Sequence, residues 1–221
     1  MSTSSASPVG VSTAALANKF LFAGIGGLAL TAVGFLFAPA NSVATSYLVG
    51  VCYWTTVVIG MLLLTILHHL TDAGWSVVIR RQYEHGMSAF KWLLILFIPL
   101  LISAWVKPGL VWPWMDLSHP IGEGHTVGTD MLYEKKSGFL NRGMFTVLTV
   151  VFFGVWIWLA ARFRKASFTQ DGDGAPKWTF MNRKTAGFGV VLTGLSLTAA
   201  AILWMKSLEY HWFSTMYGVW F

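Results

Sequence analysis

The 221-residue sequence predicts an all-α fold: an integral membrane helical bundle with about five complete transmembrane helices and the start of a sixth. Hydrophobic residues make up 55% of the chain and charged residues only 11%, less than half of the roughly 25% found in soluble domains. Residues 20–71 contain no Asp, Glu, Lys or Arg, a run long enough for two crossings of the hydrocarbon. This composition argues against a soluble globular enzyme. It also argues against a disordered chain, because disorder needs low hydrophobicity and high charge.

The uncharged run breaks at residues 38–42, where Pro39 ends one helix and Asn41 or Ser42 can cap the next. The break predicts spans at about 20–38 and 43–67, and later apolar stretches predict spans at about 88–106, 139–161 and 185–205. The apolar run 212–221 is interpreted as an incomplete sixth span, because it is too short to cross the bilayer as a helix. Residues 1–18 are predicted to form a flexible cytoplasmic tail, residues 19–221 the bundle, and the turn-rich residues 170–174 a flexible loop.

The basic residues predict how the bundle is oriented. With five spans, one side of the membrane collects ten Lys and Arg residues and the other collects five. Because basic loops favour the cytoplasm, the N-terminus is placed there, and residues 107–138 face the periplasm of a bacterial inner membrane. The net charge of +6 is therefore interpreted as a topology signal, and no nucleic-acid partner is expected. Five tryptophans near the predicted span ends are expected to be interfacial anchors; they are Trp92, Trp105, Trp156, Trp158 and Trp204.

The most informative ionisable residues lie where the second predicted span ends. In a helix, His68, His69 and Asp72 would share roughly one face. Histidine titrates near neutral pH, and a nearby carboxylate can hold its tautomer, as a proton relay or a quinol-oxidising base requires. The alternative follows from depth, because His68 lies about 38 Å of helix beyond Val43. The trio would then be two interfacial histidines with a capping aspartate.

A second group of charged residues follows closely. Gly74 is expected to bend the chain, so that the following residues run as an amphipathic stretch along the cytoplasmic face. Arg80 and Arg81 lie four and three residues before Glu84, which predicts an ion pair on one helix face. The alternative is a surface anchor in which the arginines bind acidic lipid headgroups.

The sequence predicts no metal or haem site. The single cysteine, Cys52, excludes a disulfide within the chain and any CxxC motif. Two axial histidines would have to face each other from different helices, whereas His68 and His69 are adjacent on one predicted helix. The segment after the third span also carries several ionisable residues whose spacing matches no ligand motif, so it is interpreted as a solvated docking surface. These residues are Asp116, His119, Glu123, His125 and Asp130.

Four segments, read in order, carry a family resemblance. They are residues 68–81 (HHLTDAGWSVVIRR), 139–141 (FLN), 167–171 (SFTQD) and 206–218 (KSLEYHWFSTMYG). Their order and spacing resemble the ActF-like subunits of alternative complex III, which belong to the NrfD/PsrC-like membrane proteins. The resemblance covers nearly everything from the first span onward, and the last segment is the most specific.

The resemblance implies a membrane subunit of a respiratory quinol:cytochrome c (or other electron acceptor) oxidoreductase complex. Such a subunit contributes a quinone pocket, a proton half-channel or both, and it has no redox centre and no covalently bound cofactor of its own. The implied partners are an ActC-like membrane subunit, cytochrome c subunits, an iron–sulfur subunit, phospholipids and quinol. Family members are larger and built as two bundles, so the chain is expected to be the N-terminal half or one piece of a split subunit. The residues in the region expected to line the proton path or quinone site are His68, His69, Asp72, Arg80, Arg81 and Glu84.

Two other functions remain open. The chain could be a structural scaffold that holds its neighbours through small residues such as Ala23, Gly27 and Thr31, which allow helices to approach closely. A secondary transporter is ranked last. Transporters use broken helices and polar groups near the middle of the membrane, whereas the predicted spans are nearly free of ionisable residues.

Overall fold

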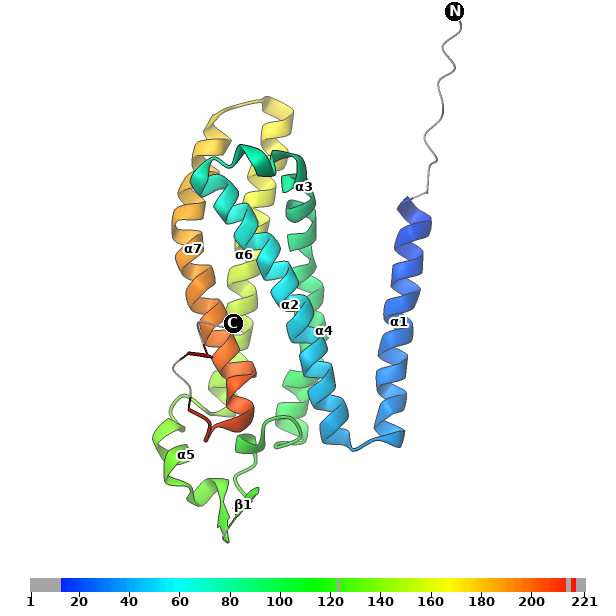
Figure 1. Ribbon diagram of the computed structural model, residues 1–221, viewed down its shortest axis with the longest axis vertical. Helices are drawn as coiled ribbons and strands as arrows, with labels where there is room; N and C mark the ends of the chain where they lie inside the picture. Colours follow the sequence, from blue (N-terminus) through cyan, green and yellow to red (C-terminus); the bar gives the residue numbers. More distant parts are fainter. Residues whose placement is uncertain (1–12, 123, 214–215, 218–221) are drawn as a thin grey trace, which may run out of the picture. The chain divides into compact units, whose positions relative to one another are not determined.

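A computed structural model describes residues 13–122, 124–213 and 216–217, and it is all-α apart from one short strand pair (Figure 1). Five helical segments of the described chain are long and apolar enough to cross a membrane. They are Ala15–Phe37, Ala40–Thr71, Gly74–Val106, Arg142–Asp173 and Lys177–Glu209. The predicted fold class and the five spans are confirmed. The predicted partial span 212–221 lies largely outside the described residues.

The chain divides into two compact units, Met1–Val43 and Ala44–Phe221. In the first unit, α1 (Thr13–Phe37) is a single apolar helix whose side chains are almost all exposed. Because α1 begins at Thr13, residues 13–18 are helical, and the predicted tail extended too far. Alanine and leucine in this stretch are strong helix formers, so the helix begins before the apolar run does. A side chain added at Gly27 would meet no described atom within 4 Å.

The second unit is a bundle of four long helices, namely α2 (Ala40–Thr71) from Ala44 onward, α4 (Phe90–Val106), α6 (Arg142–Asp173) and α7 (Lys177–Trp204). After α2, the short turn η1 (Gly74–Ser76) reverses the chain. Helix α3 (Val77–Gly86) then continues through η2 (Met87–Ala89) into α4 as one run (Figure 1). Val77 and Val78 at the start of α3 are exposed, whereas Glu84 is fully buried and α3 contacts α6. The stretch is therefore part of the bundle, and the prediction that it runs along the membrane face is wrong.

Helices α6 and α7 are longer than their predicted spans, because charged Lys and Arg residues extend helices well beyond the apolar stretch. Helix α6 reaches Asp173 and ends at Gly174, whose φ of 62° is the left-handed conformation that glycine adopts readily. The Gly174 N–H donates to the Gln170 carbonyl at 2.8 Å. The predicted flexible loop at 170–174 is therefore the last turn of α6 and its cap.

The bundle interior is rich in aromatic side chains. Trp156 and Trp204 are 0% and 3% exposed, with ring centroids 5.9 Å apart, so they are core residues and their prediction as interfacial anchors is wrong. By contrast, Trp92, Trp105 and Trp158 are exposed on the bundle surface. Hydropathy cannot separate these cases, since the lipid and the protein interior are both apolar.

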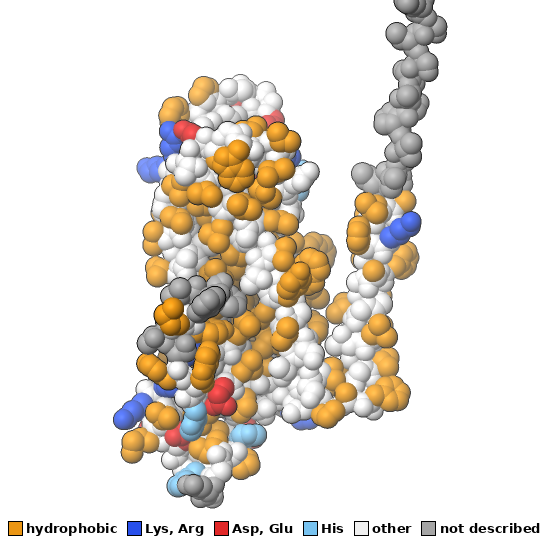
Figure 2. All heavy atoms as spheres, in the orientation of Figure 1, with side chains coloured by type: hydrophobic (Ala, Val, Ile, Leu, Met, Phe, Trp, Pro, Cys, Tyr) orange, Lys and Arg blue, Asp and Glu red, His pale blue; other side chains and the backbone are white. Residues whose placement is uncertain are grey.

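Residues 107–122, 124–141 and 206–213 gather at one end of the bundle, which we call the loop end. They form η3 (Pro113–Met115), β1 (Pro120–Gly122), β2 (His125–Thr126), η4 (Val127–Thr129), α5 (Met131–Lys136) and η5 (Lys206–Glu209). Trp112 is buried, and its Nε1–H donates to the Trp204 carbonyl at 2.9 Å. No three His, Cys, Asp or Glu side chains of the described residues converge as a metal site, and Glu123 lies outside those residues. Figure 2 shows charged side chains at both ends of this bundle and apolar ones between them.

The environment of Asp130 at the loop end predicts how the stability of the fold depends on pH. Its carboxylate pairs with His211 Nε2 at 2.6 Å. Desolvation raises the pKa of Asp130, but its polar neighbours, among them the Leu132 N–H and His211, outweigh it and hold the pKa below the usual 3.8. A lowered pKa stabilises the fold at higher pH, and this contribution is lost as the pH falls through the folded-state pKa.

We therefore expect Asp130→Asn to lower the unfolding temperature at about pH 5 and to cost progressively less towards about pH 3. Thermal unfolding of the purified protein across this range tests the prediction. Glu134→Gln is the comparison, since Glu134 is exposed and its side chain forms no ion pair with the described residues. A cost of Asp130→Asn that grows as the pH falls would contradict the prediction.

Candidate functional site

The candidate site begins where α2 ends. Asp72 has a φ of 50°, which is left-handed, and the Ala73 N–H donates to the His68 carbonyl at 3.1 Å. This is the pattern of a Schellman cap, with Asp72 in the position that glycine usually occupies. Helix α2 therefore ends at Thr71, and Asp72 does not continue the face of the two histidines.

The side chains confirm this separation. Both imidazoles are buried, whereas 64% of the Asp72 side chain is exposed and its carboxylate pairs with Arg183 of α7. The expectation that all three residues share one helix face is wrong, because the left-handed residue turns the chain away. Asp72 ties the end of α2 to the start of α7 at the bundle surface.

The backbone role of Asp72 leads to a prediction. Alanine in a left-handed conformation costs about 1 kcal/mol or more, and glycine costs almost nothing. We expect Asp72→Ala to lower the free energy of unfolding by about 1 kcal/mol and Asp72→Gly to leave it nearly unchanged. Unfolding by denaturing detergent measures both. Equal losses in the two variants would instead assign the contribution of Asp72 to its exposed ion pair with Arg183.

His68 is held from both sides of its ring. The Ser76 hydroxyl donates to the Ala73 carbonyl at 3.0 Å, so its oxygen accepts from His68 Nδ1–H at 2.6 Å. On the other side, Arg80 Nη1 donates to His68 Nε2 at 3.4 Å. A guanidinium can only donate, so both contacts fit the neutral imidazole with its proton on Nδ1. The tautomer follows from the hydrogen-bond network.

His69 has a different environment. Its ring stacks on Phe163 of α6, with centroids 5.6 Å apart and planes 3° from parallel. Its Nε2 is buried and has no hydrogen-bond partner among the described residues, and the same holds for both amide atoms of Asn182 on α7. A buried polar atom without a partner costs about 1–3 kcal/mol. Such atoms have the capacity to bind a polar ligand or water.

Glu84 is at the centre of the site. It is 0% exposed, yet two arginines reach it from the same helix: Arg80 Nε lies 3.2 Å from Oε1 and Arg81 Nη1 lies 2.9 Å from Oε2. These distances confirm the ion pairs with Glu84 that the i+4 and i+3 spacing predicts. Ser167 of α6 completes the group, because its hydroxyl donates to Glu84 Oε2 at 2.8 Å and accepts from Arg81 Nη1 at 3.1 Å. Both oxygens of the buried carboxylate thus face an arginine, and Oε2 is hydrogen-bonded, whereas Oε1 has no hydrogen-bond partner among the described residues.

Arg81 connects this buried group to the surface. Its Nη2 lies 2.5 Å from Asp171 Oδ2, and 52% of the Asp171 side chain is exposed. Its guanidinium also lies over the Phe168 ring, 4.7 Å from the centroid. A continuous chain of polar contacts therefore runs from Ser76 through His68, Arg80, Glu84 and Arg81 to Asp171. We call this chain the buried ionic network, and the end of the bundle that contains it the polar end.

Five of the six candidate residues lie together at the polar end, and Asp72 lies apart at its surface. Four polar contributors were not predicted from the sequence, namely Ser76, Ser167, Asp171 and Asn182. Ser167 and Asp171 belong to one of the segments that carry the family resemblance, but they lie more than 80 positions from Glu84. No spacing rule connects residues so far apart in the chain.

Comparisons with known proteins assign the chain to no family. No model of a known protein family matches the chain, and the comparison with curated proteins finds no similar sequence. The resemblance to the ActF-like subunits therefore stays a prediction, and any function has to be argued from the site.

Proposed function

We propose that the chain is a membrane subunit of a bacterial respiratory quinol:electron acceptor oxidoreductase, of the ActF-like kind. In this proposal the buried ionic network is a proton half-channel that opens at the polar end. The subunit carries no redox centre, and quinol oxidation and electron transfer take place with its ActC-like, iron–sulfur and cytochrome c partners. Quinol oxidation releases two protons with its two electrons, so a proton path has a place in such a complex.

The observation that carries the proposal is the fully buried Glu84 carboxylate and its connection to Asp171 at the surface. Arginine keeps its proton in proteins, so the groups that can gain and lose one are Asp171, Glu84 and His68. The two arginines form ion pairs with Glu84 and orient the carriers. The Ser167 hydroxyl donates to Glu84, and this hydroxyl can reorient when Glu84 gains or loses a proton.

The distribution of charge supports a cytoplasmic location for the polar end. Arg80, Arg81, Arg164, Lys165 and Arg183 all belong to it, and basic residues favour the cytoplasmic side. In this orientation the loop end faces the periplasm, and the N-terminus is cytoplasmic. We propose the bacterial inner membrane as the location, in line with the family resemblance.

Glu84→Gln in the assembled complex tests the proposal. Glutamine keeps the size of the side chain and one accepting oxygen, but its NH2 group cannot accept a hydrogen bond and it cannot carry a proton. Lost proton transfer typically slows a reaction by about 10²-fold or more. We expect quinol oxidation coupled to proton movement in proteoliposomes to fall about 10²-fold or more. Ser167→Ala, which leaves both ion pairs in place, is expected to reduce coupled turnover as well. Asp72→Asn is the matched control at the same end and should retain turnover.

One observation favours a scaffold instead. Two arginines pair with Glu84, and Ser167 of α6 hydrogen-bonds to it. These contacts could simply hold α3 against α6 without moving protons, and we call this alternative the clamp. A clamp predicts normal turnover and proton release in Ser167→Ala and in any assembled Glu84→Gln complex. That result would overturn the proton half-channel.

A further inference from the structure

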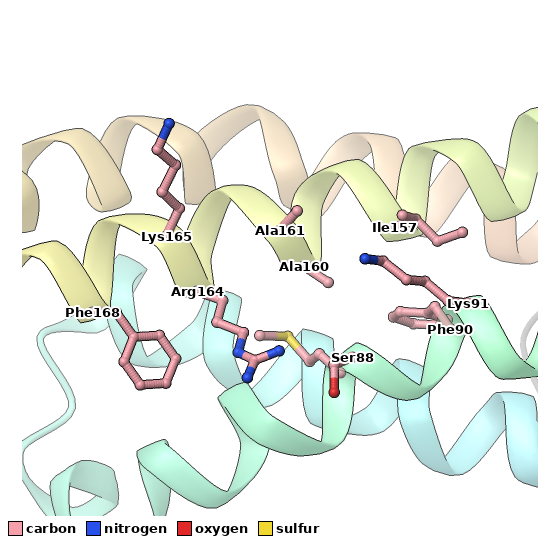
Figure 3. Close-up of a pocket in the computed structure, with 10 residues that line it drawn as sticks. Ser88, Phe90, Lys91, Ile157, Ala160, Ala161, Arg164, Lys165 and Phe168 are labelled. Carbon is pink, nitrogen blue, oxygen red and sulfur yellow. The ribbon is translucent and has the colours of Figure 1, made fainter.

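A groove at the polar end, separate from the buried ionic network, carries its own chemistry. It lies between α6 and the η2–α4 segment, has a volume of about 270 Å³ and is drawn in Figure 3. Phe90, Ile157 and Ala160 supply apolar walls on the side that leads into the bundle. Three cationic residues, Lys91, Arg164 and Lys165, line it, and no acidic residue does.

These cations lack a counter-ion within the described part of the chain. None of the three forms an ion pair with a carboxylate of the described residues. Figure 3 shows Arg164 reaching into the groove and Lys91 extending along it towards Arg164, while Lys165 points away at the rim. The Arg164 guanidinium lies 5.3 Å from the centroid of the Phe168 ring, which holds its plane in place. The groove therefore presents an oriented guanidinium and an ammonium to the same space.

We propose that this groove binds one anionic glycerophospholipid. Its phosphate would lie between Lys91 and Arg164, and its acyl chain would follow the apolar wall of Ile157 and Ala160 towards the middle of the bundle. Guanidinium groups bind phosphate oxygens through paired N–H donors, and basic pockets between transmembrane helices bind anionic headgroups. The charge selects this ligand, because a neutral quinone or a zwitterionic lipid would leave the excess of cations uncompensated.

The test uses the purified protein in mild detergent, titrated with phosphatidylglycerol or phosphatidylcholine and observed by native mass spectrometry. We expect one phosphatidylglycerol per chain to be retained and phosphatidylcholine to bind at least tenfold more weakly. Lys91→Gln combined with Arg164→Gln is expected to weaken phosphatidylglycerol binding at least tenfold. Arg162→Gln is the matched control: Arg162 is exposed on α6, two residues from Arg164 and so on another face. It should change the affinity less than twofold.

A second variant separates a lipid from a free phosphate. Ala160→Phe keeps every cation but fills the apolar part of the groove, so it should abolish retention of phosphatidylglycerol, and glycerol phosphate should not compete with the lipid. Three results would overturn the proposal: equal affinity for phosphatidylcholine, equal weakening by Arg162→Gln, or displacement of the lipid by decylubiquinone at equal concentration. The last result would assign the groove to a quinone.

Discussion

Replacing Glu84 with alanine is expected to lower the free energy of unfolding by about 3–5 kcal/mol. The carboxylate is fully buried and faces two guanidinium groups, so its removal leaves Arg80 without a carboxylate partner among the described residues and Arg81 paired with Asp171 alone. The Ser167 hydroxyl loses its acceptor as well. Breaking a buried ion pair is costly mainly because of the charge that is left behind.

Unfolding in denaturing detergent, followed by helical circular dichroism, measures this loss. The matched control is Glu134→Ala, since Glu134 is exposed and forms no side-chain ion pair with the described residues. Its cost should stay within about 0.5 kcal/mol. A second variant, with Glu84→Ala and Arg80→Ala combined, should recover part of the loss, because it removes the arginine whose carboxylate partner is lost. A loss below about 1 kcal/mol for Glu84→Ala would show that water reaches the site, as an exposed ion pair contributes no more than that.

Trp156→Ala is expected to destabilise the bundle by about 3 kcal/mol or more, as aromatic-to-alanine changes in packed cores do. The indole is fully buried, lies 5.4 Å from Phe153 between ring centroids, and donates from Nε1 to Ser196 Oγ at 2.8 Å. The substitution creates a cavity among aromatic rings and removes the hydrogen bond between α6 and α7. In a membrane the cost comes from lost packing, since lipid supplies no hydrophobic driving force between helices.

Trp158 is the natural control for this experiment. It has the same side chain, lies two residues further along the same helix, and is 48% exposed. Trp158→Ala should cost less than about 1 kcal/mol, measured in the same detergent unfolding assay. Similar losses for the two variants would mean that Trp158 is covered by something other than lipid or detergent.

The buried ionic network shows how far prediction of the site could reach. The pairing of Arg80 and Arg81 with Glu84 was predictable, because residues three and four apart meet on any helix. The depth of Glu84 was not, since nothing local distinguishes a charged face turned to α6 from one turned to water. Asp72 shows the opposite failure: the spacing rule placed it with the histidines, but the helix ends one residue earlier and a left-handed turn moves it away.

The sequence by itself determined that this chain is a membrane bundle and roughly where its helices cross, because a bilayer accepts only long apolar helices whose backbone groups are satisfied internally. Only the tertiary structure decided which side of each helix faces its neighbours. Lipid and protein interior are equally apolar, so Trp156 and Trp158 look alike in the chain. Contacts between distant segments, such as Ser167 with Glu84, depend on how α3 and α6 pack, and packing is a property of the assembled bundle.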